Sequence, residues 1–162
     1  MGRGVVRLLR TRPLTLDRIG QAFPLVQATF PEVTLDEWTH FAGAAVSRRE
    51  PLPAGILTVL SELDYIAGLS IYRVEADLQH RCALVADHFF ALDLFDRGAV
   101  VHALAEALED VAREHGCVAV HTILPERVAK GRNGAGGLIA TLHDLGHQVG
   151  MVRLCKRLGQ SV

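Results

Sequence analysis

The sequence contains little cysteine, few aromatic residues and no long apolar run. No stretch approaches the roughly 20 apolar residues that cross a bilayer, so we expect no membrane partner. Arginines interrupt the apolar part of residues 1–13, which indicates that this opening is not a secretory signal. The three cysteines, Cys82, Cys117 and Cys155, include no CxxC pair and are too few for a disulfide framework. We therefore expect reduced, buried thiols in a cytoplasmic protein.

The chain also lacks a strong excess of either charge. Its formal net charge is −1 over 162 residues, and 49% of them are apolar. This composition is typical of a soluble globular protein, and the length fits a single domain, residues 1–162. Nucleic-acid binding needs clustered cations that neutralise phosphates, so we expect no nucleic-acid partner. The histidines and cysteines have no metal-ligand spacing, so we expect no metal site.

Hydrophobic periodicity predicts an α+β protein in which strands and helices are intermixed. Thr34 and Glu37 form a T-x-x-E capping box for the second helix, and Gly116 ends the helix that starts near Val100. The expected strands are residues 4–9, 55–62, 67–75, 82–92, 118–124 and 148–158. The expected helices begin after Thr15, at Thr34, near Val100 and near Leu138. The predicted order is β-α-α-β-β-β-α-β-α-β, a mixed sheet with helices on both faces.

Three sequence segments within this predicted order of strands and helices resemble the GNAT acyltransferase superfamily. Residues 8–19 are similar to its opening strand and turn, residues 93–117 to its central turn and helix, and residues 142–158 to its closing helix end and strand. The resemblance covers nearly the whole chain. It implies a GNAT-like fold and an N-acyltransferase that passes an acyl group from acetyl-CoA, or another acyl-CoA, directly to an amine.

The resemblance implies a coenzyme A site at the start of the long helix. A helix N-terminus offers N–H groups and partial positive charge to a pyrophosphate, and glycine lets the backbone approach closely. Here Asp96 stands where the family has an arginine, and Ala99 and Val101 stand where it has glycines. The residues expected at the cofactor are Phe90, Ala91, Leu92, Arg97, Gly98, Ala99, Val100, Val101, His102 and, in a later glycine-rich loop, Asn133.

Asp87 is the candidate base for the attacking amine. Strict alternation along the strand places four side chains on one face, Val85, Asp87, Phe89 and Ala91. Asp87 is the only ionisable member of this set, and a partly buried aspartate can act as a base or amine anchor. A structural carboxylate is the other interpretation. His88 lies on the opposite face in this scheme.

His143 is the remaining candidate for the acid that protonates the departing thiolate. Many family members have a tyrosine for this step, and Leu142 occupies the matching position here. Adjacent helix residues point about 100° apart, so His143 would have to reach the site from a different direction. An exposed helix histidine without a catalytic role is the alternative.

The acceptor is expected to be a small-molecule amine or a peptide amine. The family builds its acceptor pocket from the first two helices and the hairpin, and the substrate-binding candidates there are Trp38, Glu62 and Tyr72. The missing tyrosine and Val101 also allow a second hypothesis. In it the chain is a catalytically degenerate GNAT-like binding or dimerisation module, and a homodimer is compatible with both.

Overall fold

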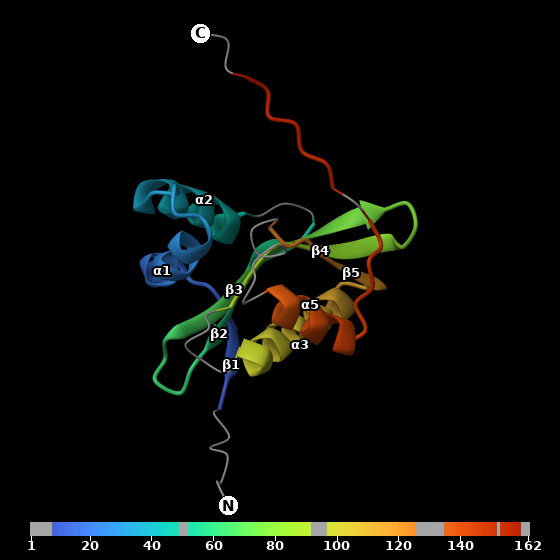
Figure 1. Cartoon of the computed structure of the whole chain (residues 1–162), viewed down its shortest axis with the longest axis horizontal. Coiled ribbons are helices and arrows are strands. Elements are labelled where there is room, and N and C mark those ends of the chain that lie inside the picture. The colour runs from blue at the N-terminus through green and yellow to red at the C-terminus, as the bar shows by residue number, and fades with distance from the viewer. Residues whose placement is uncertain (1–7, 49–51, 92–96, 126–134, 152, 160–162) are drawn as a thin grey trace, which may run out of the picture.

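The computed structural model describes residues 8–48, 52–91, 97–125, 135–151 and 153–159. Within these ranges the chain forms a five-stranded sheet with helices packed against both faces (Figure 1). This confirms the α+β class expected from the sequence. No helix in the described ranges is both long and apolar enough to span a bilayer.

The elements follow the expected order as far as the last helix. The strands are β1 (Arg10–Pro13), β2 (Ala54–Leu60), β3 (Ile66–Asp77), β4 (Arg81–Ala91) and β5 (Ala119–Thr122). The helices are α1 (Ile19–Thr29), α2 (Leu35–Ser47), α3 (Arg97–Glu114) and α5 (Ala135–Asp144), with a 3-10 turn (Leu16–Arg18) before α1. The first strand begins at Arg10 rather than at residue 4, and residues 4–7 lie outside the described ranges.

The spatial order of the strands follows the chain, β1-β2-β3-β4-β5. The first four strands pair antiparallel, and β5 pairs with β4 in parallel. A parallel neighbour needs a long crossover, which α3 supplies. Only residues 92–96 separate the end of β4 from the start of α3, so the two ends belong to the same part of the molecule.

The larger core lies between the sheet and helices α3 and α5. Helix α3 buries Val100, Val101 and Leu104 completely in it. The β3 residue beneath the first turn of α3 is Gly68, where a Cβ atom would lie 2.6 Å from Val100 Cγ1 and 3.0 Å from the carbonyl oxygen of Phe90. The absence of a side chain at Gly68 therefore allows α3 to pack directly on β3 and β4.

The second core lies under α1 and α2 on the other face of the sheet. The predicted capping box is present: the Glu37 N–H donates to Thr34 Oγ1 at 3.2 Å, and the Thr34 N–H donates to Glu37 Oε2 at 2.8 Å. Trp38 follows directly and is buried, with its Nε1 donating to the carbonyl oxygen of Ile19 at 2.8 Å. These contacts fix the first turn of α2 against α1.

The strand expected over residues 148–158 is not formed. Residues 147–151 and 153–159, the C-terminal segment, have no regular secondary structure, and Figure 1 shows the segment leading away from the sheet. Val149 and Leu154 within it are 85% and 91% exposed. A strand needs a neighbour that pairs with its N–H and C=O groups, and none of the described strands pairs with this segment. The apolar pattern therefore remains exposed.

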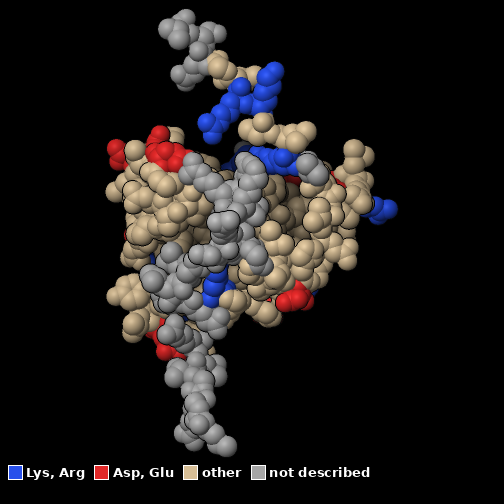
Figure 2. All heavy atoms as spheres, in the orientation of Figure 1, with Lys and Arg blue, Asp and Glu red and all other residues tan. Residues whose placement is uncertain are grey.

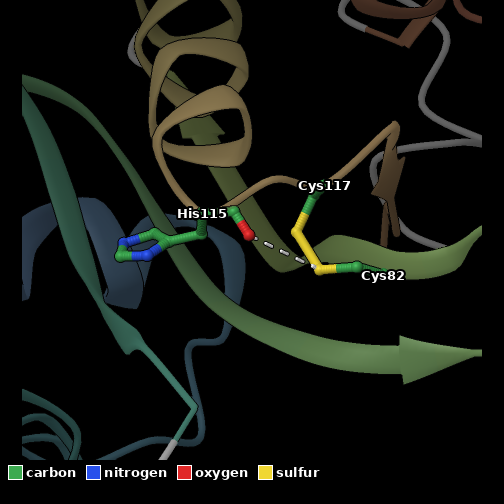
Figure 3. Close-up of a disulfide and its surroundings, with 3 residues drawn as sticks. All are labelled: Cys82, His115 and Cys117. Atoms are coloured by element: carbon green, nitrogen blue, oxygen red, sulfur yellow. Dashed lines mark hydrogen bonds between the residues drawn. A yellow bond between two sulfur atoms is a disulfide. The ribbon is translucent and has the colours of Figure 1, made fainter.

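Two of the three cysteines correct the expectation of reduced thiols. Cys82 at the start of β4 and Cys117 after α3 form a disulfide, with their Cα atoms 4.7 Å apart (Figure 3). Cys82 Sγ also lies 4.0 Å from the carbonyl oxygen of His115. The two cysteines are 35 positions apart in sequence, but the parallel pairing of β4 with β5 brings them together. Cys155 is free and exposed rather than buried.

Candidate active site

A one-residue bulge interrupts β4 at Asp87. Ile71 of β3 pairs with His88, whereas the next β3 residue, Tyr72, pairs with Ala86. Asp87 is therefore an extra residue in β4 that pairs with no residue of β3. Such an insertion bends the strand and reverses the alternation of side chains beyond it.

The bulge changes which side chains of β4 share a face. Ala86 and Phe89 both pack in the α3-side core, although strict alternation would separate them. His88 and Phe90 line a cavity beside α1 and α2 instead. The prediction that Val85, Asp87, Phe89 and Ala91 share one face is therefore wrong beyond the bulge. Side chains alternate between the two faces only where no residue is inserted into the strand.

The pairing of β4 with β5 ends at the same point. Residues Ala83 to Ala86 pair with Ala119 to Thr122, and the Ile123 N–H donates to the Ala86 carbonyl oxygen at 2.8 Å. Strand β4 continues to Ala91, but the described part of β5 does not follow it. Among the described residues, no strand therefore pairs with the edge of β4 beyond the bulge on the side of β5.

The first turn of α3 begins shortly after the end of β4 in sequence and changes from partly exposed to buried within it. Arg97 is half-buried, Gly98 and Ala99 are exposed, and Val100 and Val101 are fully buried. The valine that replaces a family glycine therefore lies in the core rather than over the exposed turn. A helix start of this kind directs N–H groups and partial positive charge toward solvent, which suits an anion.

The other residues expected at the cofactor lie at the end of β4 and along α3. Phe90 is buried and Ala91 is half-buried. His102 is exposed, with its Nδ1 atom 3.4 Å from Glu106 Oε2. Leu92 and Asn133 lie outside the described residues.

Asp87 lies between two arginines. Its carboxylate forms an ion pair with Arg73 of β3, and its Oδ1 atom is 4.0 Å from Arg153 Nη1 in the C-terminal segment. Figure 2 shows positive side chains gathered along this segment, which carries Arg153, Lys156 and Arg157. The described residues contain no cluster of three or more potential metal ligands.

His143 is exposed in the last turn of α5. Leu142, at the position of the family's tyrosine, is 5% exposed and packs in the α3-side core. Within the described ranges no hydrogen bond or ion pair joins His143 to Asp87. The structure therefore does not bring the two candidates for proton transfer into contact.

A cavity of about 440 Å³ lies between α1, α2 and the sheet. We call it the α1–α2 cavity. Seven of its ten lining residues are apolar, and the polar ones are Glu32, Glu37 and His88. Trp38, an expected substrate-binding residue, is part of the wall.

The other two substrate-binding candidates lie elsewhere. Glu62 Oε1 accepts a hydrogen bond from the Leu8 N–H at 2.8 Å. Tyr72 packs against the α3-side core, where burial, together with the charge of Glu114, raises the pKa of its hydroxyl. Neither residue lines the α1–α2 cavity.

His88 is the functional candidate that sequence reasoning missed. Its ring lies 6.0 Å from Phe30, 6.3 Å from Phe41 and 6.0 Å from Phe90, measured between ring centroids. Burial, with a smaller contribution from the positive charge of Arg153, lowers the His88 pKa below its ordinary 6.5. The ring is therefore neutral at pH 7. The bulge that turns it toward the cavity has no local signature in the sequence.

Solved structures similar to this chain include several whose names describe them as N-acetyltransferases. The aminoglycoside N-acetyltransferase AAC(6')-Iy in complex with CoA is 12% identical, with a TM-score of 0.72 and 99% of each chain covered. A ribosomal-protein-alanine N-acetyltransferase from Brucella melitensis biovar Abortus 2308 is 16% identical, with a TM-score of 0.70 and coverage of 93% of this chain and 100% of that chain. The aminoglycoside 6'-N-acetyltransferase AAC(6')-Ih from Acinetobacter baumannii is 14% identical, with a TM-score of 0.71 and coverage of 94% and 100%.

These similarities cover nearly the whole chain and concern its fold. The protein has the GNAT fold, as the three sequence phrases predicted. No protein-family model and no curated protein sequence matches the chain.

Proposed function

We propose that the protein is an acyl-CoA-dependent N-acyltransferase. The donor is acetyl-CoA or another acyl-CoA, and the acceptor is a small-molecule amine or a peptide amine. The observation that carries the proposal is the edge of β4 beyond Asp87, with which no described strand pairs on the side of β5. This stretch contacts the first turn of α3 on one side of the sheet, and its Phe90 lines the α1–α2 cavity on the other. A donor and an acceptor can therefore meet across it.

The donor's pyrophosphate binds at the first turn of α3 in this proposal. The Gly98 N–H in the exposed first turn supplies a hydrogen bond, and the helix N-terminus and the Arg97 guanidinium supply positive charge. The pantetheine follows the open backbone of β4 at Phe90 to Leu92, while His102 and Asn133 lie close to the nucleotide. AAC(6')-Iy, which is described in complex with CoA, shares this fold.

The transfer is direct. The amine nitrogen attacks the thioester carbonyl carbon, the C–N bond forms, the C–S bond breaks, and CoA leaves as a thiolate that takes up a proton. The ammonium loses one proton to Asp87 before attack, and the nitrogen loses a second proton to solvent after the C–N bond has formed. His143 gives a proton to the departing thiolate and regains one from solvent, and Asp87 releases its proton to solvent. Holding the two reactants together contributes about 7–11 kcal/mol without either group.

Donor binding is tested by thermal unfolding with acetyl-CoA. A ligand at 100 times its dissociation constant stabilises the folded state by about 2.7 kcal/mol, so saturating acetyl-CoA should raise the melting temperature. Gly98→Glu adds a carboxylate at the anion site and should abolish this increase. Gly20→Glu, in the exposed first turn of α1, is the matched control, because nothing lies within 4 Å of the new Cβ there.

If neither wild-type protein nor Gly20→Glu is stabilised by acetyl-CoA or by longer acyl-CoAs, the proposal is wrong. If Gly98→Glu retains full stabilisation, the cofactor does not bind at the start of α3.

A second candidate is a binding or dimerisation module without turnover. The buried Leu142 in place of the family's tyrosine favours it. This candidate predicts CoA binding, or a homodimer measured by light scattering, with no thiol released in the presence of any amine. Release of CoA thiol with an amine acceptor excludes it.

A further inference from the structure

The α1–α2 cavity differs in chemistry from a site for a polyhydroxylated substrate. We propose that it binds the acceptor as a primary amine with an apolar, aromatic body. This inference rests on the N-acyltransferase function proposed above and specifies its acceptor. It excludes aminoglycosides, although similar solved structures act on them according to their names.

The size and wall of the cavity support an aromatic body. Its volume of about 440 Å³ is in the range of small-molecule sites, roughly 300–1,000 Å³. Trp38 and Phe41 of α2 contribute rings 6.3 Å apart, and Phe30 and Phe90 form an edge-to-face pair at 5.9 Å. Aromatic faces of this kind pack against a ligand ring and also attract an ammonium group.

The charges around the cavity favour a cation. Two hydrogen bonds from Thr34 to its carboxylate lower the pKa of Glu37, so this residue stays ionised. Glu32 adds a second carboxylate to the lining. His88 is neutral at pH 7 and does not repel an ammonium group. Arg153, whose positive charge also acts on His88, has its Nη1 atom 4.0 Å from Oδ1 of the adjacent Asp87.

The same wall disfavours a sugar. An aminoglycoside carries many hydroxyl groups, and each one buried without a hydrogen bond weakens binding. The described lining offers the side chains of Glu32, Glu37 and His88 as polar partners, against seven apolar residues. An amine with an apolar body leaves no such group unpaired.

The position of the cavity fits an acceptor site. His88 and Phe90 line it from β4, directly after the bulge. No described strand pairs with the same stretch of β4 on the side of β5, where we place the thioester. An amine inside the cavity therefore lies beside the stretch of β4 at which the donor is proposed to bind.

Trp38 provides a readout of the cavity that does not depend on catalysis. It is the only tryptophan in the chain, and it lines the cavity. We expect 2-phenylethylamine to change the Trp38 fluorescence saturably, with and without CoA present. Kanamycin and spermidine should cause no saturable change at the same concentrations. A change with kanamycin or spermidine and none with 2-phenylethylamine overturns the inference.

Two substitutions on α2 locate the binding site. Phe41 and Leu35 are 47% and 48% exposed, so arginine is tolerated sterically at both. Only Phe41 lines the cavity. Phe41→Arg should weaken 2-phenylethylamine binding at least tenfold, because it removes a ring and adds a like charge. Leu35→Arg should leave binding within twofold. Equal binding by Phe41→Arg and wild-type protein overturns the inference.

Failure of this inference and failure of the proposed function give different results. If acetyl-CoA stabilises the protein and thiol is released with kanamycin or spermidine but not with 2-phenylethylamine, the N-acyltransferase function holds and the aromatic acceptor is wrong. If 2-phenylethylamine binds at the cavity and acetyl-CoA does not bind at all, the cavity assignment holds and the proposed function is wrong.

Discussion

His88 is a single residue whose burial has a measurable effect on stability. Its pKa is lowered below 6.5 in the folded protein. Between that lowered pKa and 6.5 the unfolded chain binds a proton that the folded protein does not. Stability rises with pH wherever the unfolded state binds more protons. The free energy of unfolding should therefore decrease as the pH falls through 6.5, and level off below the folded pKa.

Urea unfolding at a series of pH values tests this expectation. His88→Gln removes the titrating group, so its free energy of unfolding should change less between pH 7.5 and pH 5 than that of wild-type protein. His40→Gln, at an exposed position on α2, should keep the wild-type pH dependence. If His88→Gln and wild-type protein show the same dependence, the burial of His88 has no energetic effect.

At the residue scale, the sequence predicted some site residues and missed others for a physical reason. Trp38 was expected in the acceptor pocket because the family that the chain resembles builds this pocket from its first two helices and the hairpin, and Trp38 lines the α1–α2 cavity. His88 was placed on the wrong face because alternation was counted through Asp87, and an inserted residue cannot be seen in side-chain chemistry alone. The close packing of Val100 on β3 was equally hidden, because it depends on Gly68, a residue far away in the sequence.

The contact between β3 and α3 depends on Gly68. An added Cβ atom would meet Val100 Cγ1 at 2.6 Å and a backbone oxygen at 3.0 Å. Gly68→Ala should therefore lower the free energy of unfolding by about 1–3 kcal/mol, the usual cost of overpacking. It should also weaken acetyl-CoA binding, because α3 must shift at its first turn.

The control for Gly68 is Gly43→Ala in α2, where nothing lies within 4 Å of the new Cβ. Alanine is favoured over glycine inside a helix by about 0.5–1 kcal/mol, so this variant should be slightly more stable. Denaturant unfolding measures both. A Gly68→Ala protein as stable as wild type contradicts the close packing of α3.

At the scale of helices and strands, the predictions that rested on strong local sequence signals agree with the structure. The long helix was predicted from its periodicity and its closing Gly116, and α2 from its capping box. The prediction of a last strand over residues 148–158 was wrong. The alternating pattern shows that this segment could form a strand, but the pattern cannot show whether a neighbouring strand is there to pair with it. Strand formation is a property of pairs, whereas a capped amphipathic helix satisfies most of its backbone groups itself.

At the scale of the whole molecule, the disulfide links the start of β4 to the end of the α3 crossover. Closing a loop of 35 positions corresponds to about 3–4 kcal/mol in the chain-entropy model. Reduction, or Cys117→Ser, should therefore lower the free energy of unfolding by up to this amount. Cys155→Ser should leave it unchanged, because that thiol is exposed and free.

Thiol counting checks the disulfide directly. Unfolded wild-type protein should react with one equivalent of a thiol reagent before reduction and three afterwards. Cys155→Ser should give none before reduction and two afterwards. Three reactive thiols in freshly purified, unreduced protein mean that Cys82 and Cys117 are not joined.

The extra residue in β4 also sets which rings are available to a ligand. If β4 kept Asp87 but paired with β3 without the bulge, Phe89 would turn away from α3 and His88 would be driven into the hydrocarbon interior beneath it. The bulge thus determines the lining of the neighbouring cavity as much as the composition of β4 does. A change in the position of such a bulge is therefore a route by which one scaffold can acquire a different ligand preference without any substitution in the wall itself.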